Sequence, residues 1–118
     1  MGFSLEFLKN PIQIGSPFPS SQSFAKLMVD YAKLQSNSTI VELGPGTGSV
    51  TNQIIKQMPC DSLFFAIEIN EILYKNFKNN YPETIIYHGT ANDIKKYLKM
   101  HNRSQVDCII SAIPWATL

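Results

Sequence analysis

The sequence has little of several features that mark specialised classes of protein, although its 118 residues are enough for one domain. It has no apolar run near the ~20 residues that a membrane-spanning helix needs. The two cysteines, Cys60 and Cys108, form no C-x-x-C pair and give no disulfide framework, which indicates a reducing, cytoplasmic setting. The two histidines, His88 and His101, have no carboxylate or thiol partners at metal-ligand spacing, so we expect no metal site. The net charge of +1 gives no overall excess of positive charge that would favour nucleic acid.

The order of apolar patterns along the chain predicts an α/β protein. Residues 1–19 are rich in proline and are expected to form an irregular lead-in, after which Ser20 and Ser21 offer N-caps for a first helix. Further segments follow in strict alternation: strands at 39–43, 62–69, 83–89 and 106–113, and helices at 49–58, 71–81 and 92–101. Such alternation is typical of a parallel sheet with helices on both faces, so residues 20–118 are expected to form one domain.

The stretch VELGPGTG, residues 41–48, predicts a ligand-binding turn between the first strand and its helix. Gly44, Gly46 and Gly48 allow positive φ and a close approach of a ligand to the backbone. In open α/β sheets, ligands bind outside the carboxyl ends of the strands. The spacing differs from the dinucleotide pattern G-x-G-x-x-G, because position 49 is serine, and Pro45 removes an N–H group that an anion could use. The turn therefore favours a ligand without phosphates.

Two acids near this turn narrow the choice of ligand. Glu42 ends the first strand, where a carboxylate would repel a pyrophosphate but could hold a cationic α-amino group. Glu68 ends the second strand, where an acid can accept hydrogen bonds from the paired hydroxyls of a ribose. An amino acid end, a ribose and no phosphate describe S-adenosyl-L-methionine. The alternatives are a plain turn, a structural cap at Glu42 and a solvated strand end at Glu68.

These residues resemble the motifs of the class I S-adenosylmethionine-dependent methyltransferases, which have a Rossmann-like fold. VELGPGTG matches the first motif of that family, and FAIEIN, which contains Glu68 and Ile69, matches its acidic second-strand motif. The resemblance implies that both segments bind the cofactor. The third-strand motif of the family is Gly-Asp-Ala, and here Thr90 takes the place of the acid that holds the adenine amino group, followed by Ala91. Asp93, one helical turn further on, is the alternative acid for that role.

A narrower resemblance concerns the methyl acceptor. FLKNPIQIGSPFPSS, residues 7–21, and SAIPW, residues 111–115, are similar to segments of bacterial phospholipid N-methyltransferases, which methylate phosphatidylethanolamine. The related ribosomal RNA adenine dimethylases carry an Asn-Leu-Pro-Tyr-like segment in place of the second. The resemblance favours a lipid amine as acceptor. The alternatives are an rRNA adenine N6-dimethyltransferase and a non-catalytic, cofactor-binding fragment.

The segment after the fourth strand is expected to lie beside the transferred methyl group. There Ser111 could accept a proton of the acceptor amine, Pro114 fixes the backbone, and Trp115 could offer a ring face to a cationic head group. A structural role for Trp115 as a cap on the sheet edge is the alternative. Methyl transfer from a sulfonium is an in-line displacement, so these residues would act mainly by positioning the acceptor.

Possible partners follow from three further features. The apolar side chains of residues 3–8 could touch the inner face of a membrane or pack as a lid over the site. The basic run at 95–103 could meet anionic lipid or RNA, or be a solvated helix face. The resemblance also implies a sheet of more than four strands, so we expect a truncated fold whose fourth strand is an open edge that invites self-association.

Overall fold

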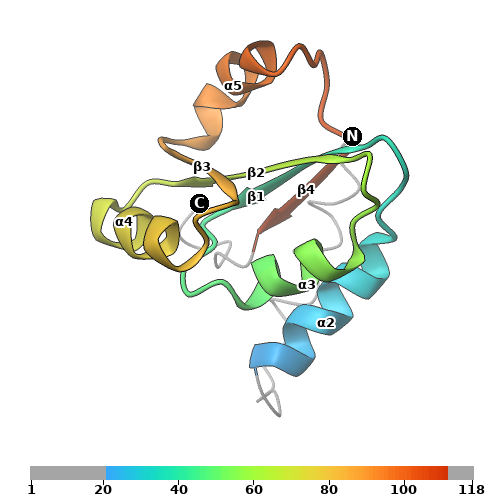
Figure 1. Cartoon of the computed structure of the whole chain (residues 1–118). Coiled ribbons are helices and arrows are strands. Elements are labelled where there is room, and N and C mark those ends of the chain that lie inside the picture. The colour runs from blue at the N-terminus through green and yellow to red at the C-terminus, as the bar shows by residue number, and fades with distance from the viewer. Residues whose placement is uncertain (1–20, 112–118) are drawn as a thin grey trace.

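A computed structural model describes residues 21–111 as alternating helices and strands (Figure 1). The lead-in and the predicted acceptor residues Pro114 and Trp115 lie outside the described residues. The helices are α2 (Ser21–Ala32), α3 (Ser49–Gln57), α4 (Glu71–Asn80) and α5 (Ile94–Met100), with a short 3₁₀ turn, η1 (Ala91–Asp93), before α5. The strands are β1 (Thr39–Leu43), β2 (Leu63–Glu68), β3 (Ile85–His88) and β4 (Cys108–Ser111).

The four strands form one parallel sheet in the order β3-β2-β1-β4. The central strand β1 pairs with β2 on one side, with Leu43 opposite Ile67, and with β4 on the other, with Leu43 opposite Ser111. The carboxyl ends of β1, β2 and β4 therefore meet at one edge of the sheet. The predicted α/β architecture with a parallel sheet is confirmed.

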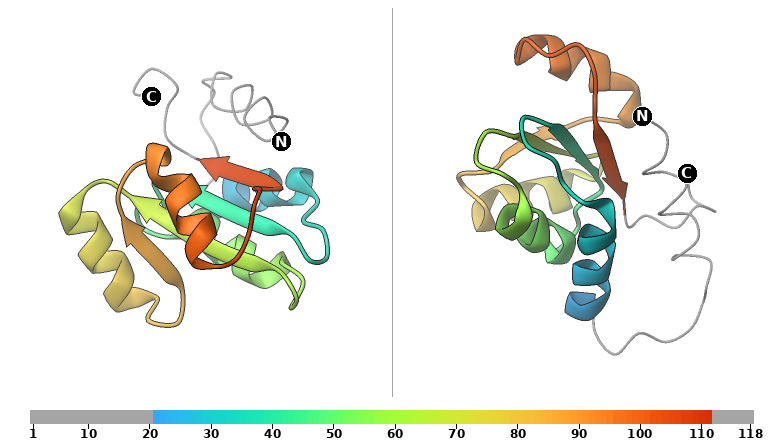
Figure 2. Two further views of the ribbon diagram at one scale, coloured as in Figure 1. Left: turned by 90° about the horizontal axis from the view of Figure 1, so that it is seen from above. Right: turned by 90° about the vertical axis from the view of Figure 1, so that its right-hand side faces the viewer.

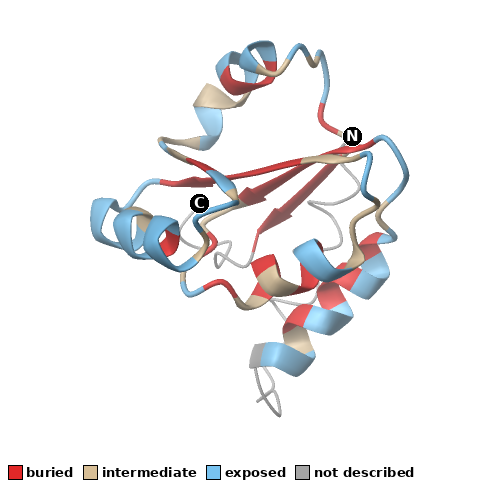
Figure 3. Cartoon of the chain, viewed as in Figure 1, coloured by how far each residue is buried: buried red, intermediate tan, exposed pale blue. Residues whose placement is uncertain are grey.

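The helices cover both faces of the sheet, as predicted (Figure 2). On one face, Ile40, Phe64 and Ile110 pack against α2 and α3, and Ala66 packs against α4. The other face is covered by α5. Because successive strand residues point to opposite sides, Val41, Phe65 and Ile109 face this helix. The strands are therefore buried between helices whose outer faces are exposed (Figure 3), which explains why their sequences are apolar almost throughout.

Several element boundaries differ from the predicted ones: β2 is Leu63–Glu68 and not 62–69, and β4 begins at Cys108 and not at 106. Two further differences have clear local reasons. The third strand begins at Ile85 and not at 83, because residues 81–84 form a turn in which Thr84 N donates to Tyr81 O at 3.0 Å. The helix predicted at 92–101 begins with the 3₁₀ turn η1, because Thr90 caps it with its side chain. Among the described residues, every helix is too short or too polar to cross a membrane.

Candidate functional site

The glycine turn connects the carboxyl end of β1 to α3, where a ligand site was predicted. Gly44, Gly46 and Gly48 have φ values of +63°, +57° and +98°, which side-chain-bearing residues rarely adopt. Gly44 N donates to Ile67 O on β2 at 2.9 Å, and Gly48 N donates to Pro45 O at 3.0 Å. The turn is therefore tied to β2 at its start and closed on itself at its end.

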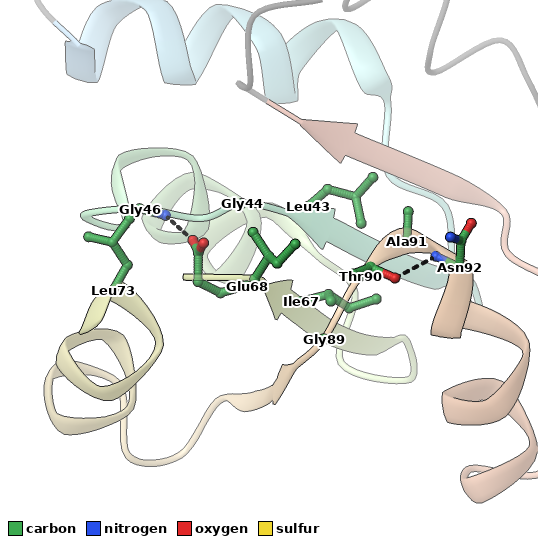
Figure 4. A pocket seen from close by; sticks show the side chains of 11 residues that line it. Leu43, Gly44, Gly46, Ile67, Glu68, Leu73, Gly89, Thr90, Ala91 and Asn92 are labelled. Atoms are coloured by element: carbon green, nitrogen blue, oxygen red, sulfur yellow. Dashed lines mark hydrogen bonds between the residues drawn. The ribbon is translucent and has the colours of Figure 1, made fainter. Parts of the chain in front are cut away.

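Beside this turn lies a cavity of about 560 Å³, which we call the glycine-turn cavity (Figure 4). It lies outside the carboxyl ends of β1, β2 and β3, the edge at which parallel sheets bind ligands. Its lining includes six residues that the sequence predicted: Gly44, Gly46, Glu68, Ile69, Thr90 and Ala91. It also includes five that sequence reasoning missed: Leu43, Ile67, Leu73, Gly89 and Asn92. Leu43 and Ile67 could have been found, because they lie at the carboxyl ends of β1 and β2, where parallel sheets bind ligands.

Glu68 is the polar centre of the cavity. Its side chain is almost completely buried, yet its carboxylate faces the glycine turn (Figure 4). Oε2 accepts a hydrogen bond from Asn70 N at 3.0 Å, and Oε1 accepts a long one from Gly46 N at 3.4 Å. A carboxylate can accept about four hydrogen bonds, so both oxygens keep capacity for a ligand's hydroxyl groups.

Gly46 leaves the turn open toward this carboxylate. A Cβ at Gly46 would have the carbonyl oxygen of Gly44 as its nearest neighbour, at 4.0 Å, so no other residue between 21 and 111 fills that space. Gly48 differs, because a Cβ there would meet the hydroxyl of Tyr81 at 2.3 Å. Gly48 does not line the cavity. The first two glycines therefore face the cavity, while the third makes room for Tyr81.

Glu42 occupies a different environment from Glu68. It lies on the α3 face of the sheet with Ile40, whereas the next residue, Leu43, lines the cavity. The side chain is 2% exposed and accepts a hydrogen bond from the hydroxyl of Thr51 in α3. Burial above all, with a smaller contribution from the nearby charge of Glu68, raises the pKa of Glu42 to about 8, against the lowering effect of the Thr51 hydrogen bond. Because Glu42 does not line the cavity, its contact with a cationic amino group stays a prediction.

The segment after β3 brings Thr90 to the cavity and directs Asp93 elsewhere. Thr90 Oγ1 accepts a hydrogen bond from Asn92 N at 3.2 Å, and Asp93 Oδ2 accepts one from Thr90 N at 3.0 Å. Together they form a capping box at the start of η1. Asp93 does not line the cavity, so its alternative role in binding the adenine stays a prediction.

Ser111 lies at the end of β4, opposite Leu43, and is buried. It is therefore next in the sheet to a cavity residue without lining the cavity itself. Its role toward an acceptor amine stays a prediction, as do those of Pro114 and Trp115.

The lining fits a nucleoside better than a diphosphate. The buried carboxylate of Glu68 would repel a phosphate, but it can accept hydrogen bonds from a pair of vicinal hydroxyls. Apolar side chains flank it, among them Ile69, which is 66% exposed, and Leu73, which is 37% exposed. These side chains can cover a planar base, while the side chains of Thr90 and Asn92 offer polar groups to its edge.

Fold and site together define a methyltransferase-type Rossmann-like domain. The chain is similar in structure to an O-methyltransferase from Bacillus cereus solved with SAH, with a TM-score of 0.59 and 16% identity over 90% of this chain and 53% of the other. It is also similar to a coclaurine N-methyltransferase bound to N-methylheliamine and SAH, with a TM-score of 0.50 and 16% identity over 72% of this chain and 30% of the other. At these identities the likeness concerns the fold.

The family follows from the sequence. Residues 7–115 match the family model described as ribosomal RNA adenine dimethylase, and the chain belongs to that family. It is 34% identical to a ribosomal RNA small subunit methyltransferase A from Chlorobium phaeobacteroides over 59% of this chain and 26% of that protein. It is 26% identical to an ornithine lipid N-methyltransferase from Singulisphaera acidiphila over 92% of this chain and 58% of that protein. The chain thus spans between 26% and 58% of the length of these two relatives.

The similarity to known proteins reverses which of the two acceptor classes is favoured. The sequence motifs favoured a phospholipid N-methyltransferase, with the rRNA adenine dimethylase as the alternative. The family match and the higher identity to the Chlorobium protein favour the alternative, whereas similarity to a lipid enzyme is found at 26% identity. The reason is that the shared cofactor motifs fit both enzyme types, and the short segments that distinguished them carry little information.

Proposed function

We propose that this chain is the cofactor-binding part of an S-adenosyl-L-methionine-dependent methyltransferase that acts on adenine amino groups of RNA. The observation that carries the proposal is the glycine-turn cavity, in which the buried carboxylate of Glu68 faces the open side of Gly46. Membership of the ribosomal RNA adenine dimethylase family supports adenine as the acceptor.

Three groups of cavity residues would each contact one part of the cofactor: the ribose, the amino acid part or the adenine. Glu68 would accept hydrogen bonds from the ribose hydroxyls. The backbone of Gly44 and Gly46 would approach the amino acid part, where a side chain would obstruct it. Ile69 and Leu73 would cover the adenine ring of the cofactor, with Thr90 at its edge. When bound, the cofactor supplies a methyl group that is already activated on a sulfonium, so the protein's task is to position the acceptor.

We place the approach of the acceptor on the side of β4. Ser111 ends that strand beside Leu43, and the residues that follow it would hold the amine with its lone pair directed at the methyl group. An adenine must leave its stack to reach such a position, which is least costly in an unpaired strand. Single-stranded or loop RNA is therefore the proposed form of the substrate.

A lipid amine is the second candidate for the acceptor. One observation favours it: the similarity to the ornithine lipid N-methyltransferase extends over 92% of this chain, although at 26% identity. The glycine-turn cavity would have the same role in both cases. A lipid acceptor would also agree with the predicted contact between the first residues and the inner membrane face.

Two measurements test the proposal. Calorimetric titration with S-adenosyl-L-methionine should show binding that Glu68→Gln weakens about tenfold or more, because the amide loses a charge-assisted acceptor oxygen. Glu71→Gln is the matched control, since Glu71 lies nearby on α4 but is exposed and paired with Lys75. Absence of binding, or equal weakening by both variants, would contradict the cofactor assignment.

The acceptor is then identified with methyl-labelled cofactor. The chain is incubated separately with adenine-containing single-stranded RNA and with vesicles of phosphatidylethanolamine or ornithine lipid. Label in RNA supports the first candidate, and label in lipid supports the second. Cofactor binding without label in either substrate would indicate a non-catalytic, cofactor-binding chain.

A further inference from the structure

The outer face of α5 carries only positively charged side chains. Lys95, Lys96 and Lys99 are all exposed and lie within little more than one helical turn, and we call them the α5 lysine face. From residue 94 to residue 106 the sequence contains no aspartate or glutamate, so no acid on α5 offsets the three lysines. Such a face attracts polyanions, provided that its charges are not neutralised from within the protein.

The described part of the chain does not neutralise these charges. Its ion pairs join Lys26 to Asp30 and Lys75 to Glu71, and neither involves α5. Asp93 is the acid nearest in sequence, and its carboxylate accepts a hydrogen bond from Thr90 N in the capping box. The ammonium group of Lys96 lies 5.4 Å from the centre of the Tyr97 ring, a contact that leaves its charge accessible.

The lysine face adjoins the glycine-turn cavity. Ala91 and Asn92, at the start of the segment leading to α5, line that cavity (Figure 4). They also line a second hollow of about 570 Å³. The second hollow lies beside α5, with Lys95 and Leu98 on one wall and Ile109 of β4 on another. A polymer whose reacting group lies at the edge of the glycine-turn cavity can therefore extend through the second hollow and past Lys95.

We propose that the α5 lysine face binds the sugar-phosphate backbone of a single-stranded RNA whose target adenine enters beside the glycine-turn cavity. The phosphates meet Lys95, Lys96 and Lys99, and the adjoining hollow has apolar walls on which a flanking base can pack. The choice of RNA rests on the proposed function, but the phosphate contact is measurable by binding alone. An anionic membrane fits the same charges less well, because α5 exposes a single large apolar side chain, Met100, to enter the lipid.

The test compares two triple variants with the same change in net charge. Lys95→Gln, Lys96→Gln and Lys99→Gln are combined in one variant. The control combines Lys26→Gln, Lys33→Gln and Lys56→Gln. These lysines are also exposed, but they belong to α2, to the residue that follows α2 and to α3, and both helices lie across the sheet from α5 (Figure 1). Anisotropy of a fluorescein-labelled, adenine-containing single-stranded RNA is measured over a series of salt concentrations. Thermal melting of both variants checks that they fold.

We expect the α5 variant to lose affinity and salt dependence together. Each phosphate contact contributes about 0.7 to the slope of log K against log salt for a single strand, so the slope should fall by about 2. The control variant should keep most of the slope and affinity of the original chain. Affinity for S-adenosyl-L-methionine should stay the same in both variants, because none of the six lysines lines the glycine-turn cavity.

Two results would overturn the inference: no RNA binding by the original chain, or an equal loss of RNA affinity in both triple variants. Failure of the proposed function is a separate outcome. RNA binding that depends on the α5 lysine face but gives no methyl transfer would support this inference and contradict the proposed reaction. Methyl transfer to RNA with an unchanged salt slope in the α5 variant would do the reverse.

Discussion

The ring of Tyr81 fills the space in which a side chain at Gly48 would have to stand. A Cβ at Gly48 would lie 2.3 Å from the hydroxyl oxygen and 2.6 Å from a ring carbon of Tyr81. The hydroxyl lies 3.2 Å from Gly48 O and 2.8 Å from Asn52 Oδ1, both in hydrogen-bonding geometry. The ring also stacks on Phe77, with centroids 4.6 Å apart. The end of α4 thus holds the start of α3 and, with it, the last residue of the glycine turn.

This relationship predicts different effects of alanine at two glycines of the same turn. Gly48→Ala should destabilise the fold by about 2 kcal/mol or more, because it combines positive φ with a clash against an aromatic ring. Gly46→Ala should cost about 1 kcal/mol of stability, from its positive φ alone, but should weaken cofactor binding more strongly, since its Cβ would project into the cavity. Urea denaturation and calorimetric titration separate the two effects. The prediction is wrong if both substitutions change stability and affinity in the same proportion.

A second prediction concerns the hydroxyl of Tyr81. Tyr81→Phe keeps the ring on Phe77 and removes the hydrogen bonds at Gly48 and Asn52, so it should lower the free energy of unfolding by about 1 kcal/mol. Affinity for S-adenosyl-L-methionine should fall less than it does in Gly46→Ala, because Tyr81 holds the turn from outside the cavity. Tyr74→Phe is the control, since that hydroxyl makes only a 3.5 Å contact with Lys78. An equal loss of stability in both variants would argue against this role of Tyr81.

The sequence was sufficient to predict the parts of the fold that depend on local pattern. The apolar run at 39–43 coincides with β1, and the parallel sheet brings Glu68 to the glycine turn, because the carboxyl ends of neighbouring parallel strands meet. Positive φ at Gly44 and Gly46 also follows from the turn that connects a strand to a helix.

The remaining details depend on contacts between residues far apart in the sequence. The partner of Gly48 is Tyr81, 33 positions later, and no local pattern indicates that pairing. Leu73 and Asn92 reach the cavity because α4 and η1 begin at the same edge of the sheet. The opposite directions of Glu42 and Leu43 could have been inferred, since successive strand residues alternate. Which of the two faces the cavity, and the bond of Glu42 to Thr51, required the three-dimensional structure.

A third prediction concerns the capping box after β3. Asp93→Ala removes the acceptor of the Thr90 N–H group and should destabilise the fold by about 1 kcal/mol. Cofactor affinity should change little if the carboxylate acts as a cap, whereas a role in binding the adenine amino group would lower affinity about tenfold or more. Thr90→Val is the companion variant, because it removes the hydroxyl that lies at the cavity and keeps the side-chain shape. Calorimetric titration and urea denaturation of the two variants decide between the roles.

A fourth prediction follows from the burial of Glu42, whose pKa is raised from 4.5 to about 8. The folded protein then binds a proton that the unfolded chain releases above its ordinary carboxyl pKa. Between about pH 4.5 and pH 8 the folded state therefore binds more protons, so the free energy of unfolding should fall as the pH rises and level off above that range. The carboxyls of Asp30 and Asp61, whose pKa values are lowered, lose their stabilising contribution only in more acidic solution, outside this window.

Glu42→Gln tests this dependence, because the amide has the size of a protonated carboxyl and can still accept a hydrogen bond from Thr51. The variant should be about as stable as the original chain near pH 5 and more stable near pH 8, by an amount on the order of a few kcal/mol. Urea denaturation at several pH values measures the difference. If stability falls equally with pH in both proteins, Glu42 titrates normally, and its carboxylate would then be available to a cationic ligand as the sequence pattern predicts.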